Sequence, residues 1–194
     1  MQPSPEHYVN LSRYDFLVIF IGVIIGLSVG HLVSFAGRFL SSDKPHKIAF
    51  AHKIYLVLLF FLQVHYWWTL WPEKVIGNTD FFTYIYLLAL PLLMYVATSI
   101  LCPESFERLD LFENYLSDRA TKFYIVVEAI LVVGALQGIF IWRQDPVNSI
   151  IRAAGFLLVL PAFFTPSKRF HIALSLTLLI LFFVYIMNCS DLKR

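Results

Sequence analysis

The 194-residue sequence has little charge and only two cysteines. Charged residues make up 14% of the chain and apolar residues 59%, whereas an ordinary soluble domain has roughly 25% charged and 45–50% apolar residues. A soluble fold would have to expose much of this apolar excess to water. The composition therefore argues against a soluble globular domain, rules out a disordered chain, and favours a protein whose solvent is a lipid bilayer.

The usual signals for nucleic-acid, metal and disulfide chemistry are also missing. The formal net charge is only +2, and the Lys and Arg residues are scattered rather than gathered in a basic stripe, so no nucleic acid is expected as a partner. Cys102 and Cys189 form neither a disulfide framework nor a zinc ribbon. No His-x-x-x-His or Cys-x-x-Cys-His arrangement exists for a metal or haem. We predict no cofactor and no metal site, and an enzyme is the less favoured class.

Long apolar runs are what the sequence has instead. About 20 helical residues cross a hydrocarbon core of roughly 30 Å, and only helices or closed barrels can span lipid. No alternating ten-residue strands appear, which excludes a barrel. The sequence predicts a single all-α integral membrane domain over 1–194, a polytopic transmembrane helix bundle of about six spans. The predicted spans are 16–37, 54–71, 81–102, 123–142, 149–166 and 170–188.

The loops indicate how such a bundle would be oriented. Six spans place both termini on one side of the membrane. Nine Lys and Arg residues lie in and beside the loops after spans one, three and five, against six on the other side. Because positive charge favours the cytoplasmic side, we predict that both termini lie outside. The fifth span contains Arg152 and Pro161, so the sequence leaves open whether it crosses fully.

The loop at 103–121 differs from the others. Its apolar residues recur at spacings of three or four, which predicts an amphipathic helix lying at the membrane interface. The loop is acidic, and a membrane-surface helix is usually basic. An alternative is therefore that Glu107, Asp110 and Glu113 dock a cytoplasmic protein partner, while a solvated connector is the plainer interpretation.

The first predicted span carries small residues every four positions, at Gly22, Gly26, Gly30 and Ser34. Such a face allows another helix backbone to approach closely. The pattern does not say whether that helix belongs to the same chain or to a second copy. Packing within the chain is the simpler expectation, and self-association is the alternative.

Four polar residues lie at membrane depth and are candidates for lining a polar pathway: Glu128, His31, Gln63 and His65. An ionisable group there costs about 2.5–3.5 kcal/mol on insertion scales, so each one is a candidate functional group. Each also has a structural interpretation, as a packed and hydrogen-bonded side chain. Arg152 lies about one turn inside the fifth span, and we expect it to extend along its stem to the head groups.

The sequence also contains four distinctive motifs: Gly26-Leu27 with Gly30-His31-Leu32, Phe-Leu-Gln-Val-His-Tyr-Trp-Trp at 61–68, Pro-Leu-Leu-Met-Tyr at 91–95, and Cys102-Pro103-Glu104 followed by Asp110 and Tyr115. Together they resemble those of a widespread group of small, uncharacterised, multi-span bacterial inner-membrane proteins. The resemblance covers about the first two thirds of the chain. It implies a bacterial inner membrane and a stand-alone bundle, and no activity of the group can be carried over to a residue here.

Two functions compete at this point. The first is a self-associating membrane protein with a channel- or transporter-like role for a small solute or ion, which the intramembrane polar groups favour. The second is a membrane-embedded sensor or effector subunit of a stress or phage-defence system, which docks a cytoplasmic partner through the acidic loop.

Overall fold

A computed structural model describes residues 13–42, 48–70, 80–104, 112–142, 146–165 and 167–191. All regular structure in this part of the chain is helical, which confirms the predicted all-α class. The elements are α1 (Arg13–Leu40), α2 (Phe50–Thr69), α3 (Phe81–Leu101), α4 (Phe112–Phe140), α5 (Pro146–Val159), the 3-10 helix η3 (Leu160–Phe163) and α6 (Lys168–Asp191).

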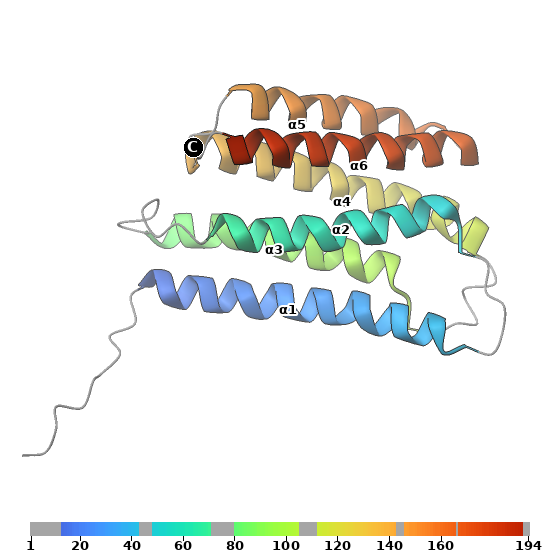
Figure 1. Ribbon diagram of the computed structural model, residues 1–194, viewed down its shortest axis with the longest axis horizontal. Coiled ribbons are helices and arrows are strands. Elements are labelled where there is room, and N and C mark those ends of the chain that lie inside the picture. Colours follow the sequence, from blue (N-terminus) through green and yellow to red (C-terminus); the bar gives the residue numbers. More distant parts are fainter. Residues whose placement is uncertain are drawn as a thin grey trace, which may run out of the picture.

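Successive helices run in alternate directions, so the start of α1 and the end of α6 lie at the same end of the bundle (Figure 1). We call this end the terminal end. Five helical segments are long and apolar enough to cross a membrane: Tyr14–Leu40, Phe81–Leu101, Thr121–Phe140, Pro146–Phe163 and Lys168–Asn188. The fifth predicted span thus has sufficient length and apolarity once η3 is added to α5. A count of six crossings stays a prediction, because it depends on α2.

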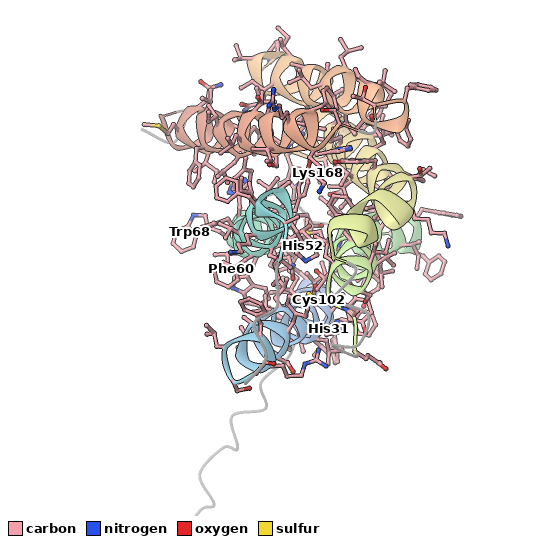
Figure 2. The ribbon with its side chains drawn as sticks, turned by 90° about the vertical axis from the view of Figure 1, so that its right-hand side faces the viewer. His31, His52, Phe60, Trp68, Cys102 and Lys168 are labelled. Carbon is pink, nitrogen blue, oxygen red and sulfur yellow. The ribbon has the colours of Figure 1, made fainter. Side chains whose placement is uncertain are left out.

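Helix α2 is not one of these five segments, and its buried polar residues face neighbouring helices. It packs against α1, α3 and α6, and His52 and Gln63 are fully buried. Viewed along the bundle, His52 points inward whereas Phe60 and Trp68 point outward (Figure 2). An exposed apolar stripe runs along the outer face of α2 through Val57, Phe60, Phe61, Val64 and Trp68. This stripe is what a helix in contact with lipid would present.

The helices pack in a closed order. The contacting pairs are α2 with α3, α3 with α4, α4 with α5, α5 with α6, and α6 with α2. These five helices form a ring, and α1 packs outside it against α2 and α3. Large apolar side chains such as Leu27, Ile150 and Ile180 are more than 60% exposed on the outside. Such an apolar exterior matches a bilayer environment and would be unfavourable in water.

Some predicted boundaries were displaced. Helix α2 begins at Phe50 rather than after Lys53, because Lys53 lies exposed in the first turn and does not interrupt the helix. Helix α4 begins at Phe112 and continues without a break to Phe140. The second half of the 103–121 loop therefore belongs to the helix of the fourth span, and 105–111 lie outside the described residues. The structure does not confirm a separate interfacial helix.

The small-residue face of α1 is divided between two environments. At Gly22 an added Cβ would lie 2.7 Å from the ring of Trp67, so this glycine allows α2 to approach closely. At Gly26 and Gly30 an added Cβ would meet nothing within 4 Å, and Ser34 is exposed. Among the described residues, packing within the chain thus accounts for Gly22, and close packing of a helix on the other three positions stays a prediction.

Helix α3 has a side-chain cap at its start. The Asp80 carboxylate accepts a hydrogen bond from the Thr83 backbone N–H at 2.8 Å, which satisfies one of the free donors of the first turn. The Thr83 side chain and backbone N–H together hold the pKa of Asp80 below its usual value. The capping contribution to stability is therefore present above the usual carboxyl pKa and is lost as the pH falls through the lowered one.

We expect Asp80→Ala to lower the thermal unfolding midpoint at neutral pH, because α3 loses this cap. Asp80→Asn should retain most of the stability, since an asparagine oxygen also caps a helix. The difference between wild type and Asp80→Asn should shrink as the pH is lowered, because only the carboxylate titrates. Equal midpoints for Asp80→Ala and wild type at neutral pH would show that the cap contributes nothing.

Candidate functional site

A cavity of about 160 Å³ lies inside the ring of five helices. All five contribute to its wall, and α1 contributes nothing. The apolar wall includes Leu59 and Leu62 from α2, Met94 from α3 and Leu131 from α4, with Leu181 from α6. A largely apolar space of this size between helices is uncommon in a well-packed protein interior, where voids larger than a water molecule are few.

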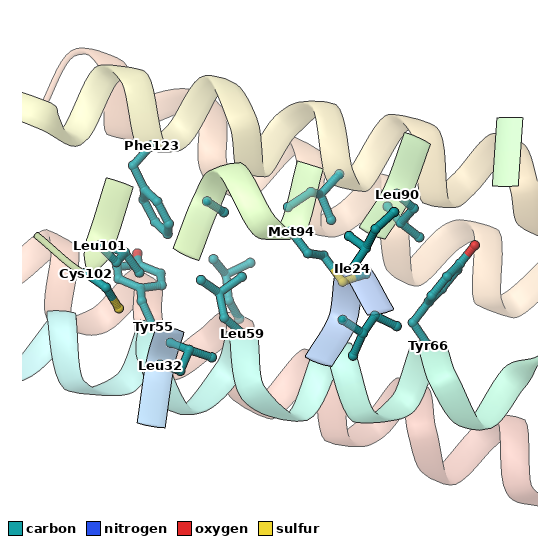
Figure 3. Close-up of a cluster of buried hydrophobic side chains, with 14 of the residues drawn as sticks. Ile24, Leu32, Tyr55, Leu59, Tyr66, Leu90, Met94, Leu101, Cys102 and Phe123 are labelled. Atoms are coloured by element: carbon teal, nitrogen blue, oxygen red, sulfur yellow. The ribbon is translucent and has the colours of Figure 1, made fainter. Parts of the chain in front are cut away.

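The cavity is long and narrow. On α2 its wall extends from Tyr55 to Thr69, which is about 21 Å at 1.5 Å per residue. Tyr55 and Phe123 lie together at one end and Tyr66 lies near the other, with Leu59 and Met94 between them (Figure 3). Trp142 also contributes to the wall. The cavity therefore follows the bundle axis for a large part of the length of the helices.

The two ends of the cavity differ in polarity. Near the terminal end, the lining side chains include His65, Gln137, Arg152 and Tyr185. The Arg152 guanidinium donates to the Gly134 carbonyl at 2.6 Å and to the Tyr185 hydroxyl at 2.5 Å. Its central carbon lies 4.9 Å from the centre of the Tyr185 ring, and the His65 ring packs edge-on against the same ring at 5.4 Å. Tyr185 thus links Arg152 of α5 to His65 of α2.

Two glycines lie beside this arrangement. At Gly134, whose carbonyl accepts from Arg152, an added Cβ would meet only Leu90, at 3.9 Å. Gly155 follows Arg152 by three residues, and a Cβ there would lie 3.4 Å from Leu131 and 3.5 Å from Leu181. At these distances an added Cβ would make ordinary van der Waals contact, so α5 lies packed against α4 and α6 at this position. The hydrogen bonds to Gly134 and Tyr185 hold Arg152 against α4 and α6, whereas the sequence predicted that it extends to the head groups.

A proline accounts for a second polar contact at this end. Pro91 lies inside α3 and has no N–H, so the carbonyl of Leu87, four residues earlier, loses its helical partner. The Tyr66 hydroxyl donates to this carbonyl at 2.8 Å. The Gln137 side chain donates to the Tyr86 carbonyl at 2.7 Å. Among the described residues, the buried side-chain oxygen of Gln137 has no hydrogen-bond partner.

The opposite end has a hydrogen-bonded chain that joins three helices. The Tyr55 and Tyr124 hydroxyls lie 3.1 Å apart, and the Tyr124 hydroxyl lies 2.8 Å from His171 Nδ1. The Tyr124 and His171 rings are stacked. These buried groups satisfy one another and fix α2, α4 and α6 together at this end. Their role is structural, since the partners are already paired.

The four predicted pathway residues do not converge. His65 lines the cavity, whereas Gln63 faces α1 and α3, where it donates to Thr98 Oγ1 at 3.4 Å. Ser28 donates to the same hydroxyl at 3.0 Å. His31 lies half-buried on α1, outside the ring. Glu128 is buried on α4 and does not line the cavity. A common pathway through all four residues is therefore not what the geometry offers.

Glu128 differs from the other three predicted pathway residues because its carboxylate is buried and unpaired among the described residues. It is 8% exposed, and within the described part of the chain neither of its carboxylate oxygens has a hydrogen-bond partner. Buried polar groups are nearly always paired. An unpaired carboxylate on a spanning helix therefore keeps Glu128 as a candidate functional residue at a separate position.

The residues proposed to dock a cytoplasmic partner are not described. Glu107 and Asp110 lie outside the described residues, and only the backbone of Glu113 is described, in α4. Docking through this loop stays a prediction. Elsewhere, within the ranges that the structure describes, no three His, Cys, Asp or Glu residues lie together as metal ligands would.

Sequence reasoning missed Tyr185 and assigned Arg152 to the head groups. One signal could have placed both residues at this site. Asn148 and Arg152 are four residues apart on α5, and Tyr185 and Asn188 are three apart on α6, so each helix has a polar face. The structure joins these faces, since Asn188 donates to Asn148 at 3.1 Å one turn from the pair of Arg152 and Tyr185.

Comparisons with family models, with curated proteins and with solved structures gave no match for this chain. The interpretation of the cavity therefore depends on its own geometry and chemistry. Membership of the bacterial inner-membrane group suggested by the sequence motifs stays a prediction.

Proposed function

We propose that this chain is a membrane protein of the bacterial inner membrane that binds a small, largely apolar solute inside its ring of five helices and takes part in moving it. The observation that carries the proposal is the cavity of about 160 Å³ between α2, α3, α4, α5 and α6. Because the cavity lies inside the ring and follows the bundle axis, the proposed role is that of a channel or transporter.

The wall of the cavity favours a largely apolar guest. Ligand sites are typically lined by apolar side chains with a few polar groups that fix orientation. This cavity has that composition, with Leu and Met along its middle and polar groups at one end.

The length of the cavity favours movement over simple storage. Its wall on α2 extends for about 21 Å along the helix axis, against a hydrocarbon core of roughly 30 Å. A solute that enters at one end would therefore be carried through much of the membrane thickness inside the protein.

The first test is photolabelling in phosphatidylcholine nanodiscs with a diazirine-bearing dodecanol, followed by mapping of the labelled residues. We expect saturable labelling of cavity residues such as Leu59, Met94 and Leu181, and competition by unlabelled dodecanol. Gly134→Leu should abolish this labelling. An added Cβ at Gly134 meets only Leu90, at 3.9 Å, and the rest of the leucine side chain would occupy the cavity.

Gly26→Leu is the matched control, because Gly26 lies outside the ring with nothing within 4 Å of an added Cβ. It should leave the labelling unchanged. Labelling confined to the lipid-facing side chains, or unaffected by Gly134→Leu, would contradict the proposed function.

Gly26→Leu also tests self-association through α1. If a second copy packs on Gly26 and Gly30, the leucine side chain would displace it, and the oligomer would dissociate on size-exclusion chromatography.

A further inference from the structure

Within the part of the chain that the structure describes, the positive charge at the polar end of the cavity has no opposite charge beside it. Among the described residues, the Arg152 guanidinium contacts the Gly134 carbonyl, the Tyr185 hydroxyl and the Tyr185 ring, and no carboxylate. The other polar groups lining this end are neutral oxygen and nitrogen groups of Tyr, Gln and Thr, together with His65. A permanent cation thus lies at one end of an apolar space.

Arginine cannot release this charge. Its guanidinium stays protonated in proteins and carries five N–H donors in a fixed planar arrangement. Two of those donors are used on neutral acceptors, at 2.6 Å and 2.5 Å, so others remain for a guest. An anion is the partner with the most favourable geometry and energy, because charge-assisted hydrogen bonds are roughly twice as strong as neutral ones and a partly desolvated charge is costly without compensation.

The position of Arg152 along the bundle suits an amphipathic molecule, which has a polar head group and an apolar tail. Arg152 lies six residues after Pro146, the first residue of α5, which is about 9 Å along the helix axis. This is near one surface of the membrane. From there the apolar wall runs toward Tyr55 and Phe123 at the far end of the cavity. A head group at Arg152 would thus have its tail directed along the axis of the bundle.

We propose that the cavity takes a single-chain amphipathic anion, whose anionic head group pairs with Arg152 and whose unbranched apolar chain fills the space between α2, α4 and α6. This inference rests on the proposed function and narrows its solute to one chemical class. Tyr185 holds the guanidinium in place through its hydroxyl and its ring. The narrow volume of about 160 Å³ favours one chain over the two chains of a membrane lipid.

The test is competition for the photolabelled cavity by dodecanoate and by dodecanol, which share a chain and differ in charge. In wild type we expect dodecanoate to compete about tenfold better than dodecanol, the preference typical of a hydrogen bond to a charged group. Dodecyl sulfonate should share the preference. Arg152→Gln should abolish it by weakening the binding of dodecanoate alone, and Arg152→Lys, which keeps the charge, should keep part of it.

The outcomes separate the two proposals. If neither compound competes and no cavity residue is labelled, the proposed function fails. If both compete equally in wild type and in Arg152→Gln, the cavity binds apolar chains and only the anion proposal is overturned. Should Arg152→Gln not fold, the wild-type ratio still decides. Suppression of labelling by phosphatidylglycerol nanodiscs without any competition by dodecanoate would overturn the proposal in favour of a two-chain lipid.

Discussion

Replacing Gly22 with leucine is expected to loosen α1 from the ring and to destabilise the protein by about 1–3 kcal/mol, the usual cost of overpacking a tight contact. The reason is the contact with α2. A Cβ at Gly22 would lie 2.7 Å from one atom of the Trp67 ring and 3.0 Å from the next, so the ring must move before any larger side chain fits. Because Trp67 lies near the end of α2, the displacement would disturb α1 and α2 together.

The measurement is the thermal unfolding midpoint of the purified protein in nanodiscs, followed by size-exclusion chromatography. Gly26→Leu, one turn further along the same face, is the control, since nothing lies within 4 Å of its added Cβ. It should unfold close to wild type. If the two variants were destabilised equally, the loss would come from leucine on this face of α1 in general, and the contact with Trp67 would not be its cause.

The same two glycines show what the sequence can and cannot specify. Small residues at a spacing of four identify one face of a helix and predict that another helix can approach it closely. It does not identify the neighbour. The structure places Trp67 against Gly22 and leaves Gly26 and Gly30 facing outward, a division that depends on the angle at which α1 crosses α2.

Long apolar runs predicted the helices well because their cause is local. A charge-free run of about 20 residues has few alternatives to a spanning helix, whatever surrounds it. The predicted helix boundaries were wrong where a charged residue lies in the first or last turn, as Lys53 does at the start of α2. There the backbone continues the helix because the charged side chain remains exposed.

The candidate site was predicted only in part because it depends on the order of the helices around the ring. Depth along the axis follows from residue number. Which helices are neighbours does not follow from residue number. The sequence therefore predicted that Arg152 extends to the membrane surface, whereas its guanidinium is hydrogen-bonded to Gly134 and Tyr185 on the adjacent helices.

Glu128 leads to the second large prediction. It is 8% exposed, and its two carboxylate oxygens have no partner among the described residues. Burying a polar group without a hydrogen bond costs about 1–3 kcal/mol in protein mutational data. Glu128→Leu removes that cost at similar side-chain size, so we expect it to stabilise the protein by about this amount. Glu128→Gln should stabilise it less, because the amide is uncharged but still polar and unpaired.

A gain in stability at Glu128 would mean that the chain retains an unfavourable residue, which is typical of positions kept for function at the expense of stability. The decisive comparison sets the unfolding midpoint against movement of dodecanoate across vesicles containing the protein. We expect Glu128→Leu and Glu128→Gln to raise the midpoint and to reduce the movement, while binding in the cavity stays at the wild-type level because Glu128 does not line it. A lower midpoint for Glu128→Leu would instead reveal a stabilising role for the carboxylate, and unchanged movement would remove Glu128 from the transport mechanism.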